Sequence, residues 1–384
     1  MSSPDWHSDA FPELRSGPPW VMQEMISAQP VLVEELLSSP PPDVAAAADG
    51  VAAALAHNRL VIVCGCGTSE HAAHGIAAML AAAVEPEKAM LVRARPAFSA
   101  AQDPAPGACI AISHDGETRA SMLALQAAHS EGARTIAITQ RPGSSVARAA
   151  ELALVTFRHD DSWCHTVAYT SALAAGAALA ARLGPFPADP AVARELLTYA
   201  SASPHAAPVA ERLADRRVVL CAGPEADLST ARELALKIAE ATHLPTLALE
   251  LETVLHGHLA AHEPADALII VAVTESGDLA RSIRRTGDVA RAAAAVGLRV
   301  AGLFSGAYDP ALSGDLTPAG RLIMQLPSPD LVHPRLAGLL AGAGALQTLT
   351  LELAHARHTN PDLIRREQAR YRDAARAAEM SGDW

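Results

Sequence analysis

Aromatic residues and cysteines are scarce in this sequence, and each scarcity excludes a class of protein. Phe, Trp and Tyr make up 3% of the 384 residues, so the core must be aliphatic. The five cysteines are odd in number and three lie in apolar, strand-like runs, so we expect reduced thiols in a cytoplasmic protein. Cys64 and Cys66 are too close together for a usual zinc pair, and no second pair follows at finger spacing, so no metal is expected.

Positive charge and long apolar runs are also lacking. The formal net charge of −12 argues against a nucleic-acid surface. No run of about 18 residues free of charges and breakers suggests a membrane span. The polar, acidic N-terminus does not resemble a secretory signal. We therefore expect a cytoplasmic protein with no nucleic-acid or membrane partner, and 384 residues leave room for two domains.

One stretch organises the chain. Residues 109–112 are apolar, as in a strand covered on both faces, and Gly116 allows a tight turn before a helix over residues 119–130. Ser113 and Thr118 offer hydroxyl groups, and the helix directs its free N–H groups at the turn. The stretch predicts an anion site suited to a phosphate. The alternative is an ordinary turn in which the two hydroxyls only cap the helix.

The same design of strand, hydroxyl-bearing glycine turn and helix occurs at residues 59–83, and the chain repeats itself. The segment VIVCGCG at 61–67 aligns with VVLCAG at 218–223, and AISHDG at 111–116 aligns with AVTESG at 272–277. Strands alternating with helices in both halves predict an α/β fold of two doubly wound lobes, each a parallel sheet flanked by helices in three layers. Ligands of such sheets bind at the carboxyl ends of the strands, where the marked turns lie.

The expected organisation has four parts. An irregular segment and an entry helix occupy residues 1–43, the first lobe 44–184, the second lobe 192–355, and a charged tail 356–384. Expected strands are residues 59–64, 88–93, 109–112, 135–139, 152–156, 217–221, 267–273, 300–304 and 322–326, and long helices are expected at 163–183, 230–242 and 335–355.

Three charged residues mark the helix of the second lobe. Glu233, Lys237 and Glu240 are spaced i, i+4 and i+7, which places them on one helical face. The rest of this helix is apolar, which favours a face turned toward a cleft. A surface Glu–Lys pair is the alternative.

Taken together, these motifs resemble the SIS (sugar isomerase) family, and most closely the isomerase half of the glucosamine-6-phosphate synthases. The resemblance covers about residues 20–370. The residues that carry it are Met22-Gln23, Gln29-Pro30, Cys66-Gly67-Thr68-Ser69, Ser113 with Gly116-Glu117-Thr118, Pro142-Gly143-Ser144-Ser145, Glu233 with Lys237 and Glu240, and His256-Gly257.

The resemblance implies a phosphate site, from which this sequence departs at two positions. The implied site is lined by Thr68, Ser69, Ser113, His114 and Thr118, but the synthases have glutamine at His114 and serine where this chain has Asp115. A carboxylate about 4 Å from a phosphate charge would cost roughly 4 kcal/mol at an effective dielectric constant near 20. Either Asp115 turns away, or a protonated His114 offsets it, or the substrate carries no phosphate there.

The resemblance also implies roles in proton transfer. Glu240 would move a proton between C1 and C2 of an open sugar, and Lys237 and Glu233 would bind the sugar or order the site. His256 would open the sugar ring and would reach the site of a neighbouring subunit, which implies a homodimer. The alternative for His256 is an ordinary histidine of a surface loop.

The tail distinguishes subclasses. The synthases use a lysine near the C-terminus to form an imine with the sugar, but the lysines of this chain are Lys88 and Lys237, so that Schiff base is not expected. We also expect no glutaminase domain, no N-terminal cysteine nucleophile and no glutamine-dependent amination. The tail is expected to close over the site, with Arg365 near the ligand.

Three functions follow from the resemblance. The first is a phosphosugar isomerase or aminosugar-phosphate deaminase, the second a deglycase that splits a sugar-phosphate–amine adduct, and the third a non-catalytic sugar-phosphate-binding protein. Retention of both Glu240 and His256 favours an enzyme, and the first function is preferred. The expected partner is a small sugar phosphate, and no metal or organic cofactor is implied.

Overall fold

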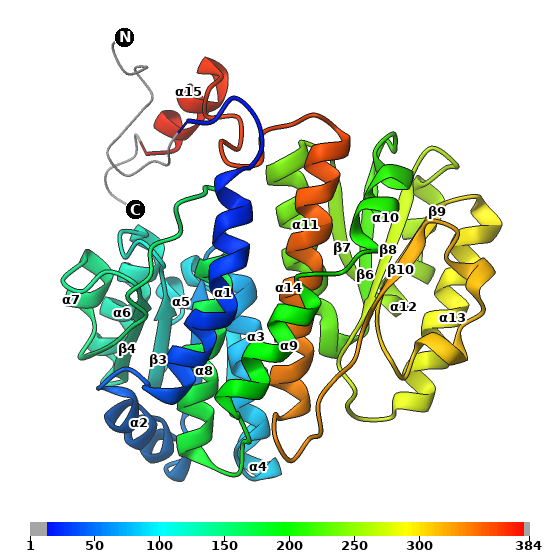
Figure 1. The fold of residues 1–384 in the computed structure, drawn as a ribbon. Helices are drawn as coiled ribbons and strands as arrows, with labels where there is room; N and C mark the ends of the chain where they lie inside the picture. The colour runs from blue at the N-terminus through cyan, green and yellow to red at the C-terminus, as the bar shows by residue number, and fades with distance from the viewer. Residues whose placement is uncertain (1–13, 380–384) are drawn as a thin grey trace.

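The computed structural model describes residues 14–379 and contains two parallel five-stranded sheets with a layer of helices between them (Figure 1). The strand orders are β2-β1-β3-β4-β5 and β10-β9-β8-β6-β7, so both sheets have the same doubly wound topology. The predicted α/β fold with two lobes is confirmed. The strands are β1 (Leu60–Gly65), β2 (Val92–Pro96), β3 (Gly107–Ile112), β4 (Arg134–Thr139), β5 (Leu152–Val155), β6 (Val219–Gly223), β7 (Thr246–Glu250), β8 (Ala267–Ala272), β9 (Arg299–Ser305) and β10 (Gly320–Met324).

The helices form one central layer and two outer layers. The central helices share one aliphatic core with the inner faces of both sheets, which explains how a chain with so few aromatics fills its interior. They are α1 (Val21–Ser38), α2 (Val44–Ala56), α3 (Thr68–Ala82), α8 (Val167–Leu183), α9 (Pro190–Ala200), α10 (Ala206–Leu213), α11 (Leu228–Thr242) and α14 (Pro334–Ala356). Separate cores lie under the outer helices α5 (Ala97–Gln102), α6 (Arg119–Ser130), α7 (Ser145–Ala149), α12 (Leu251–Leu255) and α13 (Leu279–Val296).

The carboxyl ends of the two sheets lie at opposite ends of this central layer. Helix α3 follows β1 and helix α11 follows β6, so each starts at the carboxyl end of its own sheet. Thr68 near the start of α3 contacts Glu233, whereas His74 further along α3 contacts Arg232 and His71 contacts Ser229. The two helices therefore run in opposite directions, and the loops of each lobe face the late part of the other lobe's helix.

Helix α14 is the one helix of the described residues that is long and apolar enough to cross a membrane. Its most apolar window is 89% buried inside the protein, as for a core helix. It packs against α9, α10 and α11 in the central layer (Figure 1).

Two predicted elements were wrong at their boundaries, and the strand β7 (Thr246–Glu250) was not predicted. Residues 86–89 form the short helix α4 (Pro86–Ala89), and the strand predicted there begins only at Val92. The helix predicted from Trp163 begins at Val167, because the Asp160 carboxylate accepts hydrogen bonds from the N–H groups of Thr166 and Ala168 and so fixes its start.

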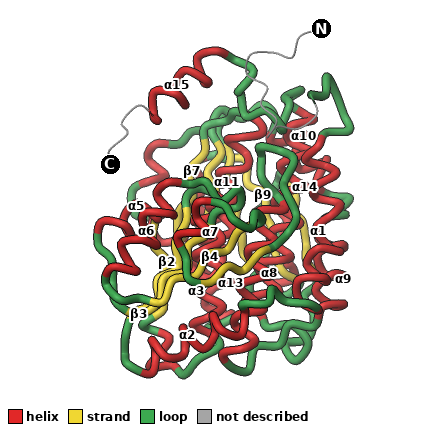
Figure 2. The backbone as a smooth tube through the Cα atoms, turned by 90° about the vertical axis from the view of Figure 1, so that its left-hand side faces the viewer, coloured by secondary structure: helices red, strands yellow, loops and turns green. Residues whose placement is uncertain are grey.

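The tail is tied to the start of the described chain. Asp362 accepts hydrogen bonds from the N–H groups of Val21 and Met22 at 2.9 and 2.8 Å, and from the Ser162 hydroxyl at 2.9 Å. Beyond it, α15 (Ala369–Glu379) lies outside the layers at one end of the molecule (Figures 1 and 2). The predicted irregular start of the chain lies mostly outside the described residues, which begin at residue 14.

Candidate functional site

Two turns meet at the carboxyl end of the first sheet. Strand β1 lies between β2 and β3, so the order of the strands reverses between β1 and β3, which is where ligands of doubly wound sheets bind. The turn after β1 brings Thr68 and Ser69 to the start of α3, and the turn after β3 carries Ser113 and Thr118 to the start of α6. The predicted hydroxyls thus belong to two neighbouring turns.

Ser113 organises its turn from within. Its hydroxyl oxygen accepts hydrogen bonds from the N–H groups of Gly116 (3.1 Å) and Thr118 (3.4 Å), and it lies 2.8 Å from the Thr118 hydroxyl. Gly116 has a φ of +78°, and a Cβ atom there would lie 2.1 Å from Oγ of Ser144. Only glycine fits this position, and the Ser144 region of the chain closes the back of the turn.

Asp115 is exposed and bonds to its own turn. Its Oδ1 accepts hydrogen bonds from the Glu117 N–H (3.1 Å) and the Ser113 hydroxyl (3.0 Å). The carboxylate therefore uses a backbone donor that a bound anion would also need. An oxyanion at this turn must compete with Asp115 or displace it.

One proposed answer to the Asp115 problem, a protonated His114, is wrong. The Nε2 atom of His114 accepts a hydrogen bond from the Asp160 N–H at 2.9 Å, so this nitrogen carries no proton. Burial lowers the pKa of His114 to about 4, with Asp160 opposing the shift. His114 is neutral at pH 7 and cannot offset the charge of Asp115.

The three charged residues of α11 lie together, in contact with the first lobe. The Lys237 ammonium forms ion pairs with Glu240 and, at 3.7 Å, with Glu233. Glu233 also accepts hydrogen bonds from the Thr68 hydroxyl (3.2 Å) and His71 Nδ1 (2.7 Å), both on α3. Lys237 and Glu233 are buried, and the side chain of Glu240 is 22% exposed.

The electrostatics separate the roles of these three groups. Burial lowers the pKa of Lys237, but the carboxylates of Glu240 and Glu233 more than offset this, so the pKa is raised and Lys237 stays charged. Burial raises the pKa of Glu233, yet the Lys237 ammonium and the His71 bond lower it below its usual value. For Glu240 burial outweighs the attraction of Lys237, and its pKa is raised. Glu240 is thus the carboxylate best suited to accept and return a proton.

Two histidines at the site were not predicted. His71 holds Glu233, as above, and His165 lies close enough to Lys237 and Asp115 to feel both charges. Burial lowers the pKa of His165 to about 4, and Lys237 lowers it further. His165 also packs against His114, with ring centroids 5.7 Å apart. Each is a single histidine in or next to an apolar helix, and no sequence pattern marks such residues.

His256 and Arg365 lie apart from this cluster within the single chain. The side chain of His256 is 77% exposed, and its nearest acidic partner is Glu252 at 3.4 Å. The guanidinium of Arg365 lies over the ring of Tyr371 at 5.1 Å in the tail, and Arg365 lowers the pKa of His243, where burial is the larger cause. His243 ends α11 three residues after Glu240, so the tail reaches this end of the helix.

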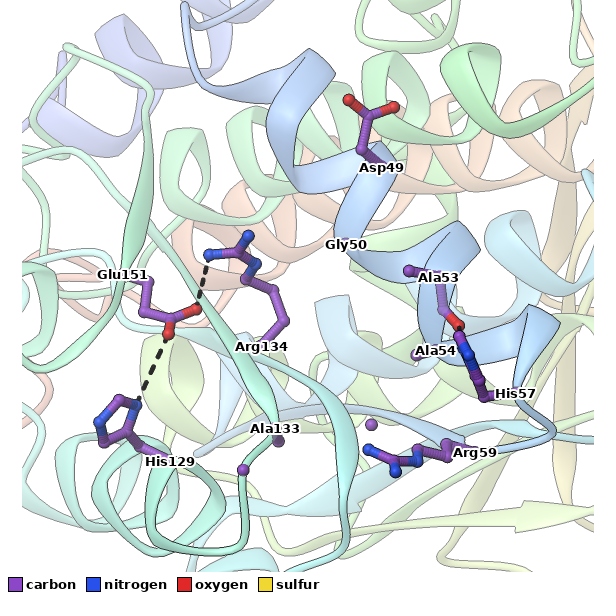
Figure 3. Close-up of a pocket in the computed structure, with 12 residues that line it drawn as sticks. Asp49, Gly50, Ala53, Ala54, His57, Arg59, His129, Ala133, Arg134 and Glu151 are labelled. Atoms are coloured by element: carbon purple, nitrogen blue, oxygen red, sulfur yellow. Dashed lines mark hydrogen bonds and ion pairs between the residues drawn. The ribbon is translucent and has the colours of Figure 1, made fainter.

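A cavity of about 500 Å3 lies at the other edge of the first sheet (Figure 3). It is lined by residues that precede or begin strands, among them Arg59, Gly107, Arg134 and Glu151, with a surface ion pair between Arg134 and Glu151 at 2.9 Å. Because doubly wound sheets bind ligands at the carboxyl ends of their strands, this cavity is not the candidate site.

Comparison with known proteins identifies the first lobe. A family model described as the SIS domain matches residues 54–182, so this part of the chain is a SIS domain, as the motifs predicted. A curated relative, glutamine–fructose-6-phosphate aminotransferase [isomerizing] of Symbiobacterium thermophilum, is 32% identical over 185 residues, which are 44% of this chain and 30% of the relative. The match thus spans less than a third of that protein's length.

Solved structures show how far the fold is shared. The C-terminal domain of glucosamine-fructose-6-phosphate aminotransferase from Francisella tularensis has a TM-score of 0.73 at 19% identity, covering 91% of this chain and 100% of that chain. The tagatose-6-phosphate ketose/aldose isomerase of Escherichia coli has a TM-score of 0.71 at 17% identity, covering 92% and 97% of the two chains. Glucosamine-6-phosphate deaminase of Thermotoga maritima has a TM-score of 0.58 at 17% identity, covering 89% and 97%. At these identities the likeness is one of fold, and it includes both lobes.

Proposed function

We propose that this protein is a phosphosugar isomerase or aminosugar-phosphate deaminase, in which Glu240 transfers a proton between C1 and C2 of an open-chain sugar phosphate. The observation that carries the proposal is the state of Glu240. Among the three charged residues of α11, Glu240 is the carboxylate that is partly exposed, and its pKa is raised. Helix α11 also contacts Thr68, in the turn after β1 of the SIS domain, where a phosphate is proposed to bind.

The proposed reaction uses the site as follows. The hydroxyls of Thr68, Ser69, Ser113 and Thr118 hold the phosphate. Glu240 removes the proton from C2 of the aldose while O1 of the carbonyl takes up a proton, which gives an enediol. Glu240 then returns its proton to C1 while O2 loses a proton, which gives the ketose, so that the proton lost by O2 balances the one gained by O1. With an aminosugar phosphate, the same proton transfer would give an imine at C2, which a water molecule would hydrolyse to the ketose and ammonia.

Lys237 is proposed to act by position and charge. Its ammonium is buried between two carboxylates and stays protonated, so it lacks the free amine that an imine requires. Its role is to hold Glu240 and to stabilise negative charge that develops on the enediol oxygens. Glu233 holds Lys237 in turn, and Arg365 is proposed to approach the ligand when the tail closes.

Ring opening is assigned to His256 of a second subunit in a homodimer. The exposure of His256, whose ion pair is with Glu252 on the neighbouring helix and not with the α11 set, supports a role across an interface. Mixing tests this proposal. Glu240→Gln and His256→Ala proteins, each inactive alone, should regain about a quarter of wild-type activity after mixing and subunit exchange, since half the dimers would then carry one complete site. Mixed samples that stay inactive while wild-type controls exchange would contradict the assignment.

The main experiment measures turnover and binding separately. A panel of fructose 6-phosphate, glucosamine 6-phosphate, N-acetylated forms and amine adducts is compared with the unphosphorylated parents by thermal shift, and ligands that stabilise the protein are then assayed. Glu240→Gln should reduce kcat by about 10²–10⁴-fold while the ligand still stabilises the protein. The exposed Glu195→Gln serves as the matched control. Full activity in Glu240→Gln would overturn the mechanism, and amine release without isomerisation would select the deglycase.

A further inference from the structure

A second cavity lies between the lobes, away from Glu240. Its volume is about 590 Å3, within the range of small-molecule sites. It is bounded by the late part of α3, the start of α11 and the start of α14, together with Glu225 and Ala226 after β6. We call it the second-lobe pocket and define it by four polar residues: His74, Ser229, Arg232 and Arg335.

The two arginines of this pocket have no acidic partner. Among the described residues, neither Arg232 nor Arg335 forms an ion pair within 4 Å. The Arg232 guanidinium instead donates to Nε2 of His74 at 3.1 Å, so this nitrogen carries no proton. Burial, followed by the charge of Arg232, lowers the pKa of His74 to about 4. Two unpaired cations beside a neutral histidine leave excess positive charge in a partly buried cavity.

Acidic groups near the pocket offset this charge only in part, and the charge of Arg335 reaches Asp227, whose pKa it lowers while burial, the larger cause, raises it. Glu225 lines the rim and is exposed to solvent. Asp227 is buried and is engaged by the N–H groups of Val273 and Thr274 and the Thr274 hydroxyl, at 2.7–3.2 Å. The starts of the long helices α11 and α14 add a further positive contribution. The net environment favours an anion.

The pocket occupies the position in the second lobe that the candidate active site occupies in the first. It lies beside the loop after β6, and β6 is flanked by β7 and β8 as β1 is flanked by β2 and β3. In the active site, the facing helix presents Lys237 and Glu240. Here the facing helix α3 presents the small residues Gly75, Ala78, Ala81 and Ala82. Its one titratable group in the pocket is His74, whose Nε2 is engaged by Arg232. The second position thus has groups that can bind, but the facing helix presents no carboxylate that can move a proton, and the Nε2 atom of its histidine is held by Arg232.

We propose that the second-lobe pocket binds a small phosphomonoester through Arg232 and Arg335 and leaves it chemically unchanged. Guanidinium groups bind phosphate oxygens with two parallel hydrogen bonds, and two arginines suit a doubly charged phosphate. The remaining volume, walled by small side chains of α3, accommodates the organic part of the ligand.

The first test uses the wild-type protein and a heavy oxyanion. Crystals soaked in tungstate should show an anomalous peak between the guanidinium groups of Arg232 and Arg335, separate from any peak at Ser113. Absence of a peak in the pocket, at a concentration that labels other sites, would overturn the proposal.

The second test is calorimetric titration with inorganic phosphate and, in a separate arm, with fructose 6-phosphate. Arg232→Met and Arg335→Met should each weaken the second-lobe binding event about tenfold or more. Ser113→Ala should leave that event unchanged, which separates this proposal from the proposed function. Arg291→Met on the outer helix α13, with the same change of charge, is the matched control. Tighter binding of fructose 6-phosphate than of inorganic phosphate would show that the pocket also contacts the organic part of the ligand. Equal binding of the two would show that it recognises only the phosphate group and would contradict a site for a phosphomonoester. Identical titrations of wild-type and both pocket variants would refute the site.

Discussion

The turns at the carboxyl ends of the two sheets differ in what fills them. In the first lobe Ser113 holds its turn with a hydroxyl, and the exposed Asp115 takes one backbone donor. In the second lobe the equivalent turn is held by the buried Asp227, which accepts the N–H groups of Val273 and Thr274. The corresponding glycines, Gly116 and Gly277, have φ values of +78° and +67°, so the two backbones turn alike. One topology therefore supports a turn whose carboxylate, Asp115, is exposed to solvent and a turn that is held by a buried carboxylate, Asp227.

This difference divides the work between the lobes. In the proposed function, the first lobe offers the phosphate-binding turns, while the second supplies Glu233, Lys237 and Glu240 on α11, the helix that contacts the first lobe through Thr68. Each prediction below changes a residue of one lobe and states the expected effect on stability or binding, beginning with the largest expected effect.

Loss of the buried ammonium of Lys237 should have the largest effect on stability. In Lys237→Met, Glu233 and Glu240 lose their cation, and Glu233 remains fully buried. Removing one partner of a buried ion pair costs about 3–5 kcal/mol of unfolding free energy. Chemical denaturation should show this loss, and activity should fall with it.

The other lysine provides the control for this prediction. Lys88 donates to the side chain of Asn58 at the surface, so Lys88→Met should change the unfolding free energy by no more than about 0.5 kcal/mol. The double variant Glu233→Gln/Lys237→Met should recover part of the stability, because the uncompensated charge is gone. Equal stability of Lys237→Met and Lys88→Met would show that the charged set is not held as described.

Asp227 should give the second lobe a pH-dependent stability. Burial raises the pKa of Asp227 to about 6 in the folded protein, against 3.8 for the ordinary group, with Thr274 opposing the shift. The folded state therefore binds the proton more tightly than the unfolded state does. This stabilisation is complete below about pH 4 and is lost as the pH rises through 6, a change of about 3 kcal/mol.

Asparagine at position 227 tests the sign of this effect. Asp227→Asn cannot titrate, so the difference in unfolding free energy between wild type and variant should favour wild type most at pH 4 and shrink toward pH 7. Denaturation curves at both pH values measure it, with the exposed Asp330→Asn as the control. A difference that grows with pH would mean that the folded pKa of Asp227 is lowered.

The fold was predictable from the sequence because its signals are local. Apolar runs of four to six residues, each followed by a glycine or hydroxyl turn, gave nine of the strands approximately, and the internal repeat gave the two lobes. β7 was missed because none of its five residues is buried, so it lacks the apolar run of an inner strand, and because it follows α11 after only a short turn. The strand predicted at 88–93 overlaps β2 only at residues 92–93, because Pro86 starts a helical turn before the apolar residues.

The candidate site was predictable only where spacing reveals a shared face. The i, i+4, i+7 spacing predicted that Glu233, Lys237 and Glu240 act together, and the structure brings them together. The neutral state of His114 depends on the N–H of Asp160, 46 residues away, and the position of His71 depends on packing between lobes. Neither contact leaves a pattern in the sequence, so the roles assigned to the site residues remain predictions.

A matched pair of substitutions should separate binding from stability between the two turns. Ser113→Ala removes the hydroxyl that accepts two N–H groups of the first turn, and the Kd for a sugar phosphate should rise about tenfold. Thr274→Val at the equivalent position removes a hydrogen bond to Asp227 at 2.7 Å and should cost about 1–3 kcal/mol of stability.

The informative comparison is between the changes in Kd and in unfolding free energy of these two variants. Calorimetry of each variant with the same sugar phosphate, and denaturation of each without ligand, give four numbers. We expect weak binding together with a loss of stability of about 1–3 kcal/mol for Ser113→Ala, because two N–H groups lose their acceptor, and a similar loss of stability with normal binding for Thr274→Val. Ligand binding that depends on Thr274 and is insensitive to Ser113 would mean that the lobes have exchanged roles.

The smallest expected effect concerns Asp115, where the first turn departs most from its second-lobe counterpart, Ser276. Asp115→Ser frees the Glu117 N–H and removes a negative charge from the turn. Because Asp115 is exposed and screened by water, the gain for a bound phosphate should be about 1 kcal/mol, or roughly fivefold in Kd. The unphosphorylated parent sugar should bind no better, and the ratio of the two Kd values is the measurement that isolates the charge. If instead Asp115→Ser weakens binding of the sugar whether or not it is phosphorylated, the carboxylate contacts the ligand directly, and the anion at this turn is the protein's own, as Asp227 is in the second lobe.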